Sequence, residues 1–339
     1  MENTTLHFTD LGIDTRLETQ LAHQGITQPT DIQAHAVPTA LAGHDIFAQS
    51  KTGSGKTLAF LLPAVQRVMK QKALSKRDPR VLIVAPTREL ATQVFTQLRL
   101  LIAGTNIKAV KILGGENFND QIKALRKEPQ FIVATPGRLK DMIKRKMVNI
   151  RSIEYCVLDE ADEMLNMGFY EDIKDILKNT PNDKDSWLFS ATMPPEVNVI
   201  AKKFMHDPKE ITVGTKNSSA KNISHQYYIV GARERYNALG AVISLNTDIF
   251  GCVFCRTKIE TQKVADKLIK DGYKAAAIHG DLSQNQRDAV MQSFRKKKIQ
   301  LLIATDVAAR GLDIPLIQHV INYDLPQVPE DYVHRIGRT

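Results

Sequence analysis

Residues 50–57, with the sequence SKTGSGKT, have the composition of a loop that binds phosphate groups. The apolar segment DIFAQ at 45–49 is typical of a buried strand, and an apolar pattern with helical spacing begins directly after the loop. Glycines let backbone N–H groups surround phosphate oxygens, and the helix N-terminus adds positive potential. Lys56 can then reach the outer phosphates of a nucleotide, while the Thr57 hydroxyl can bind Mg²⁺. We expect the nucleotide to contact Ser50, Lys51, Thr52, Gly53, Ser54, Gly55, Lys56 and Thr57.

A second group of chemically useful residues lies in CVLDEAD at 156–162. The apolar strand ends at Asp159, a carboxylate that can hold Mg²⁺ through its water shell. Glu160 follows at once and can orient or deprotonate an attacking water. An isolated Asp-Glu pair is more often a solvated turn. Its position directly after an apolar strand, downstream of a phosphate loop, favours a catalytic site in which Lys56, Asp159 and Glu160 act together.

Short apolar runs that alternate with amphipathic stretches must position these residues. Continuous apolar strands separated by helices predict a parallel sheet that is covered on both faces. The polar segment at 214–224 has no periodicity and is the best linker candidate. We therefore expect two doubly wound α/β domains. The expected strands are 45–49, 81–85, 131–134, 155–159, 187–191, 251–255, 275–279, 301–305 and 319–323, and a helix is expected over 89–102.

Composition and charge agree with a globular protein that binds polyanions. The 339 residues suit two domains, and 43% hydrophobic and 24% charged residues exclude a disordered chain. The net charge is +9, and residues 214–339 carry 18 basic residues against 12 acidic ones. A basic balance favours nucleic acid as a partner, although this signal is weak alone.

The cysteines and the first residues indicate a reducing compartment. Cys252 and Cys255 spell CVFC, which could be read as a redox pair or as half of a zinc site. Their place in an apolar run favours a buried strand, in which this spacing puts the two side chains on opposite faces. Residues 1–10 have neither a basic region nor an apolar stretch, so we expect no secretory signal and a cytoplasmic location.

With these segments in place, the chain resembles the DEAD-box ATP-dependent RNA helicases of helicase superfamily 2, in a bacterial-type minimal core. The sequence DEAD itself stands at 159–162, and the other family motifs occur in family order over essentially the whole chain. They are FTDLG (8–12), GITQPTDIQ (25–33), PTRELA (86–91), Gly114-Gly115, TPGR (135–138), SAT (190–192), VFCRTK (253–258), HGDLSQNQR (279–287), ATDVAARGLDI (304–314) and HRIGRT (334–339).

The resemblance implies two tandem RecA-like domains and a role for each motif. It implies a Q-motif region at 1–34, an ATP-binding domain at 35–213 and a C-terminal domain at 225–339. Adenine recognition falls to Gln33, with Phe8 packing nearby, and Asp313 approaches the ribose. Contacts with the RNA backbone are implied for Thr87, Arg88, Gly115, Thr135, Arg138, Arg287 and Thr305. Coupling between ATP and RNA is implied for Asp162, Ser190, Thr192, His334 and Arg335.

The sequence departs from the family pattern at a few positions. Ile26 stands where an aromatic residue is common, and Ser50 replaces the usual first glycine of the phosphate loop. The family motif HRIGRTGR stops at Thr339 here, so we expect an incomplete second domain that keeps only Arg338 of the two arginines implied to reach the γ-phosphate. An arginine that neutralises charge on a transferring phosphoryl group is a strong catalytic element.

Three functions fit these motifs. The first is an RNA helicase that uses ATP and Mg²⁺ and binds RNA without base specificity, since backbone contacts carry no sequence information. The second is an ATP-gated RNA clamp with little turnover. The third is a motor directed at DNA. ATP turnover with and without RNA separates the first two, and competition between RNA and DNA of equal sequence at fixed salt separates the third.

Overall fold

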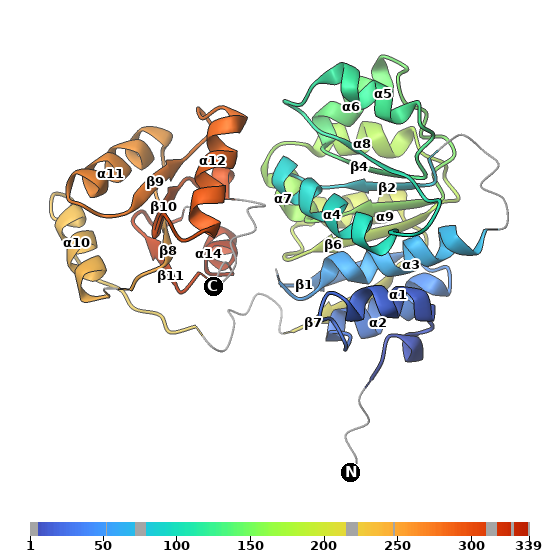
Figure 1. Ribbon diagram of the computed structural model, residues 1–339, viewed down its shortest axis with the longest axis horizontal. Coiled ribbons are helices and arrows are strands. Elements are labelled where there is room, and N and C mark those ends of the chain that lie inside the picture. The colour runs from blue at the N-terminus through green and yellow to red at the C-terminus, as the bar shows by residue number, and fades with distance from the viewer. Residues whose placement is uncertain are drawn as a thin grey trace, which may run out of the picture. The chain divides into compact units, whose positions relative to one another are not determined.

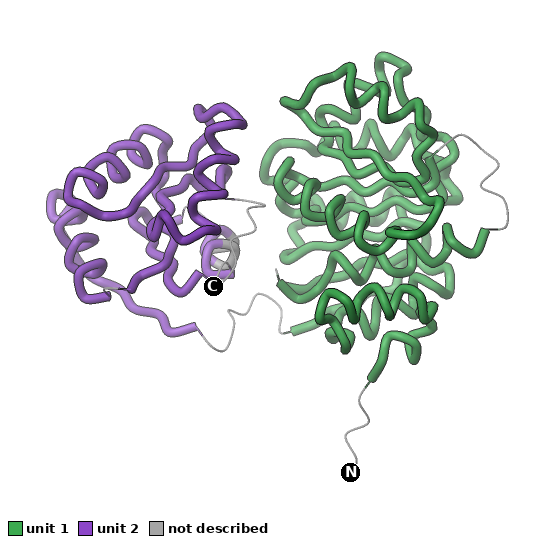
Figure 2. The backbone as a smooth tube through the Cα atoms, in the orientation of Figure 1, with its two compact units in different colours: residues 1–216 green, residues 217–339 purple. Residues whose placement is uncertain are grey.

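The computed structural model describes residues 6–51, 53–71, 79–214, 223–246, 248–309, 317–326 and 329–337. By its internal contacts the chain divides into two compact units, residues 1–216 (unit 1) and 217–339 (unit 2) (Figure 2). The predicted linker 214–224 spans this division, and its residues 215–222 lie outside the described part, as do Thr52, Asp313 and Arg338. His334 lies in a helix, but its side chain is also outside the described part.

Unit 1 contains a seven-stranded parallel sheet with the strand order β3-β4-β2-β5-β6-β1-β7 (Figure 1). The five strands expected in this unit are confirmed to within two residues. The expectation missed the two edge strands: β3 alternates buried and half-buried residues, β7 is exposed or half-buried, and neither has a continuous apolar run. The strands are β1 (Ile46–Ser50), β2 (Val81–Val84), β3 (Ala109–Ile112), β4 (Phe131–Ala134), β5 (Tyr155–Leu158), β6 (Asp185–Ser190) and β7 (Lys209–Val213).

Helices cover both faces of this sheet (Figure 1). One face packs against η1 (Thr9–Leu11), α1 (Thr15–Ala22), α2 (Asp31–Leu41), α3 (Lys56–Lys70) and α4 (Arg88–Leu101). The other face packs against α5 (Phe118–Leu125), α6 (Pro136–Lys144), α7 (Ala161–Asn166), α8 (Tyr170–Lys178) and α9 (Pro195–Phe204). The helix expected over 89–102 is α4, displaced by one residue.

The two layers explain why the strands read as unbroken apolar runs. Successive side chains of a strand point to opposite faces. In β2, Val81 and Ile83 enter the core on the α3 side, whereas Leu82 and Val84 enter the core on the α6 side. A strand between two helical layers has no solvent-facing side, so every position is apolar.

Unit 2 is a smaller parallel sheet with the order β11-β8-β10-β9 and helices on both faces. All four strands expected here are confirmed. The central strands β8 and β10 are fully buried, while the residues of edge strand β11 are half-buried. The elements are α10 (Arg235–Leu245), β8 (Gly251–Phe254), α11 (Lys258–Lys270), β9 (Ala275–Ile278), α12 (Gln284–Arg295), β10 (Leu301–Ala304), α13 (Asp306–Ala309), β11 (His319–Asn322) and α14 (Pro329–Ile336).

The three cysteines are free and buried. Cys252 lies in the core on the α12 side of the sheet and Cys255 in the core on the α11 side, so the expectation that they occupy opposite faces is confirmed. Among the described residues, no helix combines the length and the apolar character needed to cross a membrane.

These thiols should be unreactive in the folded protein. Burial raises the pKa of Cys156 to about 11 and raises the pKa of Cys255 further above its usual range. At pH 8 a thiol of pKa 11 is thiolate in about one molecule in a thousand, and only the thiolate attacks a labelling reagent. We expect Ellman's reagent to label all three cysteines within seconds in 6 M guanidinium but not in native buffer. The variant Leu245→Cys, at a position 81% exposed, supplies the fast-reacting control. Rapid labelling of a native cysteine would contradict the buried arrangement.

Candidate active site

Apart from Phe8 and Gln33, which precede β1, the predicted functional residues of unit 1 lie at or just after the carboxyl ends of the parallel strands, which all lie at one edge of the sheet. The strand order places β5, β6 and β1 side by side, and these strands precede Asp159, Ala191 and Lys51. The neighbouring strands β2, β4 and β3 precede the other predicted loops. The sheet therefore sorts the motifs into two adjoining groups along one edge.

The phosphate loop connects β1 to α3. Gly53 and Gly55 have φ values of +79° and +93°, a left-handed conformation that glycine adopts without strain. The Lys56 ammonium is buried and donates to the Ser50 carbonyl at 2.9 Å across the loop, and the Ser50 and Ser54 hydroxyls lie 2.9 Å apart. Lys56 is the first residue of α3, and its ammonium group lies within the curve of the loop where a phosphate would bind.

Gln33 holds this loop from outside. Its amide oxygen accepts from the Thr30 backbone N–H at 3.0 Å, and its amide nitrogen donates to the Gly55 carbonyl at 2.9 Å. A Cβ atom on Gly55 would stand 2.5 Å from the Gln33 amide nitrogen and 2.8 Å from the Thr30 hydroxyl. The close approach of α2 to the loop therefore requires glycine at position 55.

Asp159 and Glu160 stand buried at the end of β5. Burial is the main cause that raises the pKa of Asp159 well above its usual range; the neighbouring Glu160 charge adds to the shift, and Lys56 opposes it. Glu160 takes the left-handed conformation at φ +50°, which costs a non-glycine residue about 1–2 kcal/mol. This local strain turns the chain sharply from β5 into α7.

The carboxylate of Asp159 fits a cation. Its Oδ1 atom is buried with no hydrogen-bond partner among the described residues, and a cation nearby would relieve the cost of that burial. Within the described ranges, His, Cys, Asp and Glu side chains form no cluster of three or more that could hold a metal ion. A Mg²⁺ ion that takes one carboxylate, one hydroxyl and the remaining oxygens from water and phosphate agrees with both observations.

Asp162 links β5 to β6. One oxygen of its carboxylate accepts from both the backbone N–H and the hydroxyl of Thr192, each at 2.7 Å. The Asp162 backbone N–H in turn donates to the Ser190 hydroxyl at 3.2 Å. All three side chains are buried, so these bonds join the DEAD segment to the segment around the end of β6.

The second group of loops gathers arginine, threonine and glycine. The Arg88 guanidinium passes so close to Gly115, at φ +71°, that a side chain there would collide with it. Arg138 donates to the Glu116 carbonyl at 3.2 Å and lies over the Phe118 ring, 5.6 Å from its centre. These interactions join the loops after β2, β3 and β4 into one basic surface.

Two threonines accept backbone hydrogen bonds at this surface. The Thr87 hydroxyl accepts from the Leu90 backbone N–H at 3.2 Å and caps α4. The Thr135 hydroxyl accepts from the Gly114 backbone N–H at 3.3 Å, next to Pro136 at the start of α6. Thr87 and Thr135 therefore have structural roles in addition to the RNA contacts predicted for them.

In unit 2, Arg335 is the centre of a buried polar network. Its guanidinium forms a two-point ion pair with Asp306 at 2.6 and 2.8 Å. It also donates to Asn322 at 2.7 Å and to the Asp324 carbonyl at 2.6 Å. The Asp324 carboxylate accepts from the Arg256 backbone N–H at 2.9 Å and pairs with Arg235 at 2.6 Å. Arg335 thus joins the segments that begin at 253, 304 and 334.

Two further predicted residues lie beside this network. Arg287 donates to the Ala308 carbonyl at 3.3 Å, which ties α12 to α13. The Thr305 hydroxyl accepts from the Ala308 backbone N–H at 3.4 Å, at the start of α13. The structure therefore brings together the described residues of three separate motifs.

Comparison with known proteins identifies the family. The sequence profile of the DEAD/DEAH box helicases matches residues 30–200, and the profile of the helicase conserved C-terminal domain matches residues 235–339. The DEAD-box ATP-dependent RNA helicase CshA of Bacillus subtilis is 41% identical over 335 residues, which are 99% of this chain and 67% of that protein. The chain belongs to the DEAD/DEAH box helicase family.

Other relatives agree with this membership. CshA of Bacillus cereus is 43% identical over 332 residues, and this chain spans 62% of its length. S. cerevisiae Dbp5 bound to RNA and ADP BeF3 superposes with a TM-score of 0.87 at 31% identity, covering 98% of this chain and 85% of that one. Mss116p bound to ssRNA and AMP-PNP gives 0.86 at 28% identity, covering 100% of this chain and 73% of that one. Both units therefore have the fold of this helicase family.

Some residues of this DEAD-box chain lie where the motif pattern did not place them. Phe8 is completely buried in the core of unit 1, so its ring has no exposed surface, and the predicted packing against adenine stays a prediction. Sequence reasoning missed Thr30, Asp306 and Asp324, which hold the predicted residues in place. The spacing of Thr30 and Gln33 is that of a helix capping box and could have revealed the first of them.

Substitution of Gly55 tests the Gln33 contact. Gly55→Ala should lower the free energy of unfolding of unit 1 by about 2–4 kcal/mol, because it adds left-handed strain, a collision and a lost hydrogen bond. Gly104→Ala, at φ +76° with open space around it, should cost only the strain of about 1–2 kcal/mol. Trp187 is the only tryptophan and lies in β6, so its fluorescence during urea unfolding follows unit 1. Equal losses in the two variants would show that the Gln33 contact is unimportant.

Proposed function

We propose that this chain is an ATP-dependent RNA helicase, which couples ATP binding and hydrolysis to local separation of RNA duplexes or remodelling of RNA–protein complexes. The observation that carries the proposal is the arrangement along one sheet edge. A phosphate loop and a pair of buried carboxylates lie beside a basic surface, and Asp162 hydrogen-bonds to Thr192 at 2.7 Å between them. The relatives named as RNA helicases support the same activity.

The ATP site would use the loop after β1 and the end of β5. Backbone N–H groups of residues 50–57 and the Lys56 ammonium bind the phosphates, and Gln33 recognises the adenine edge. Glu160 accepts a proton from the attacking water. When bound, Mg²⁺ would be held by Asp159 and Thr57 and would neutralise charge on the phosphates. Gln33 also bonds to Gly55, so adenine recognition by this side chain would bear directly on the shape of the phosphate loop.

RNA contacts are proposed for the basic surface of unit 1 and, separately, for Arg287 and Thr305 of unit 2. Guanidinium groups and hydroxyls suit phosphate and ribose oxygens, so affinity should depend on salt and be insensitive to base sequence. The implied roles of Asp313 at the ribose and Arg338 at the γ-phosphate remain predictions outside the described residues. Coupling by His334 and Arg335 remains a prediction too; Arg335 supports it by holding three motif segments together.

Further features belong to the same proposal. The free, buried cysteines support a reducing compartment, and we propose a cytoplasmic location. The domain boundaries at residues 34, 213 and 225 also remain proposals.

The alternative function is an ATP-gated RNA clamp with little turnover. Measurement of ATP hydrolysis with and without single-stranded RNA decides between them, because the helicase requires RNA-stimulated turnover and the clamp requires only ATP-dependent RNA binding.

Replacement of the proposed base should separate binding from chemistry. Glu160→Gln preserves the size of the side chain but cannot accept a proton, so kcat for ATP hydrolysis should fall by about 10²–10⁴ while ATP and RNA still bind. Single-turnover hydrolysis and fluorescence anisotropy measure the two properties. Glu171→Gln, which changes the same group in α8 where Glu171 pairs with Lys174, should leave both unchanged. Unaltered hydrolysis in Glu160→Gln would remove this residue from the chemical step.

Replacement of the Thr192 hydroxyl should uncouple the two sites. Thr192→Val removes one of the two bonds to the Asp162 oxygen. We expect duplex separation to fall about tenfold relative to ATP turnover, which corresponds to a coupling free energy of about 1.4 kcal/mol. Thr180→Val removes a buried hydroxyl that donates to the Leu177 carbonyl at 2.7 Å, and it should lower neither activity selectively. If duplex separation and ATP turnover stayed in proportion in Thr192→Val, the proposed link would be wrong.

A further inference from the structure

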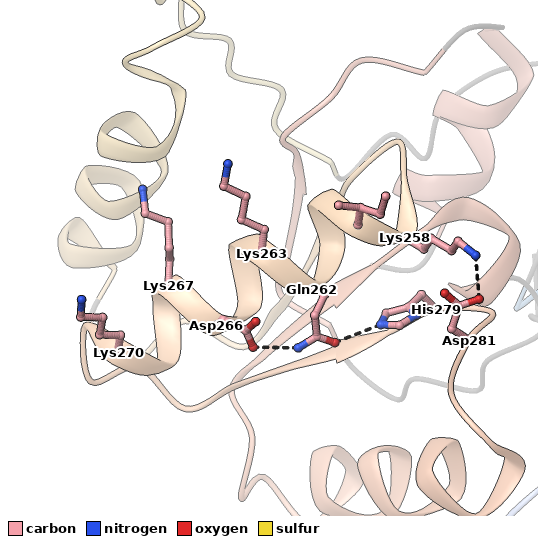
Figure 3. Close-up of a pocket in the computed structure, with 9 residues that line it drawn as sticks. Lys258, Gln262, Lys263, Asp266, Lys267, Lys270, His279 and Asp281 are labelled. Carbon is pink, nitrogen blue, oxygen red and sulfur yellow. Dashed lines mark hydrogen bonds and ion pairs between the residues drawn. The ribbon is translucent and has the colours of Figure 1, made fainter.

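Unit 2 has an open groove of about 550 Å³ along α11, most of whose lining residues lie outside the helicase motifs. The groove is lined by α11 and by the residues that follow β9, and Figure 3 shows the side chains of Lys263, Lys267 and Lys270 extending from the helix to the same side. From Lys258 to Lys270 the helix is about 18 Å long. Basic side chains therefore follow the groove over its length.

The positive charge of this groove is largely uncompensated. Asp281 pairs with Lys258 at 2.8 Å, and Asp266 accepts from the Gln262 amide at 2.7 Å (Figure 3). No carboxylate of the described residues lies within ion-pair distance of the three remaining lysines, although the Lys267 ammonium stands 4.0 Å from the centre of the Tyr236 ring. Three ammonium groups are thus available to one anionic ligand.

One end of the groove is fixed by His279. The Gln262 amide nitrogen donates to Asp266, so its oxygen faces His279 and accepts from Nε2 at 3.0 Å. His279 is 7% exposed, and its Nδ1 atom has no hydrogen-bond partner among the described residues. The Nε2 bond to Gln262 therefore joins the segment after β9 to α11 at this end of the groove.

The position of the groove favours an RNA backbone as the ligand. α11 begins within the segment 253–258, and His279 begins the segment 279–287; both segments match helicase motifs. RNA that crosses this edge of the unit 2 sheet would enter the groove at its Lys258 end. An acidic protein partner would need apolar anchor positions, but among the described residues Ile259 is the only large apolar side chain that lines the groove.

We propose that Lys263, Lys267 and Lys270 bind the phosphates of single-stranded RNA that extends beyond the helicase motifs. The proposal rests on the RNA helicase function proposed above and adds a second, length-dependent contact to it. RNA that is too short to leave the motifs would gain nothing from the groove. Longer RNA would gain affinity and release additional counterions.

The experiment compares two RNAs on matched variants. Oligouridines of six and twenty nucleotides are titrated by fluorescence anisotropy over a series of salt concentrations. The test variant is Lys263→Gln/Lys267→Gln/Lys270→Gln, and the control variant is Lys296→Gln/Lys297→Gln/Lys298→Gln, which removes the same charge at the end of α12. Removal of three phosphate contacts should make the slope of log association constant against log salt less negative by about 2. It should also weaken 20-mer binding roughly tenfold or more at 0.1 M salt.

We expect the test variant to bind the 6-mer like the wild type and the control variant to bind both RNAs like the wild type. The variant Lys263→Arg/Lys267→Arg/Lys270→Arg keeps the charge and should keep the 20-mer affinity, which excludes a folding defect as the cause. Unchanged 20-mer affinity and slope in the test variant, or an equal loss in the control, would overturn the groove proposal while wild-type RNA binding leaves the helicase function standing.

Two other results would be equally decisive. A wild type that bound neither RNA would refute the helicase proposal and this one with it. A polyglutamate peptide that bound the wild type more tightly than the 20-mer, and lost that affinity in the test variant, would assign the groove to an acidic protein partner instead.

Discussion

The parallel order of the unit 1 sheet is the constraint on which the rest of the site depends. Because every strand runs the same way, every loop that carries a motif leaves from the same edge. β5 lies between β2 and β6 in this order. The DEAD segment therefore emerges between the loop that carries Thr87 and Arg88 and the loop that carries Ser190 and Thr192. From the end of this central strand, residues 159–162 lie between the predicted nucleotide site and the basic surface.

This central position has an electrostatic cost. Asp159, Glu160 and Asp162 are all buried within four residues of one another, and Glu160 adds left-handed backbone strain. The surroundings offset the cost unevenly. Asp162 receives two hydrogen bonds from Thr192, whereas Asp159 depends on Lys56 and keeps an unpaired oxygen. The carboxylate with complete hydrogen bonding suits transmission of movement, and the carboxylate with an unpaired oxygen suits a ligand that carries positive charge.

The sequence predicted the helices and strands whose apolar residues form a regular pattern, and it missed side-chain contacts that leave no such pattern. Nine strands were predicted from their unbroken apolar runs, while β3 and β7 escaped because Lys111 interrupts the first and Lys209 and Glu210 begin the second. The residue types at the loop after β1 and at the end of β5 were also sufficient to predict a phosphate and metal site. By contrast, the bond of Gln33 to Gly55, the buried position of Phe8 and the network around Arg335 depend on residues far apart in the sequence, whereas the bond of Gln33 to Thr30 follows a local capping-box spacing that the prediction overlooked. No local pattern announces which partner a buried amide or guanidinium will find.

Arginine and lysine have different surroundings in unit 2: Arg335 is buried and hydrogen-bonded, whereas the lysines of α11 have no ion-pair partner among the described residues outside the Lys258 pair. Arg335 is 3% exposed, and its planar guanidinium is matched by a carboxylate, an amide oxygen and a carbonyl, the multiple fixed acceptors that arginine suits. The lysines of α11 have flexible stems and compact, hydrated charges, which suit a ligand whose phosphates have no fixed spacing. Four of its five N–H donors are used in these bonds and the side chain is buried, so Arg335 serves to fix the motif segments to one another. A lysine with no ion-pair partner in the protein is available to form ion pairs with the phosphates of a flexible polyanion. The positive charge of unit 2 thus performs two tasks, and burial together with bonding, rather than the number of charges, tells them apart.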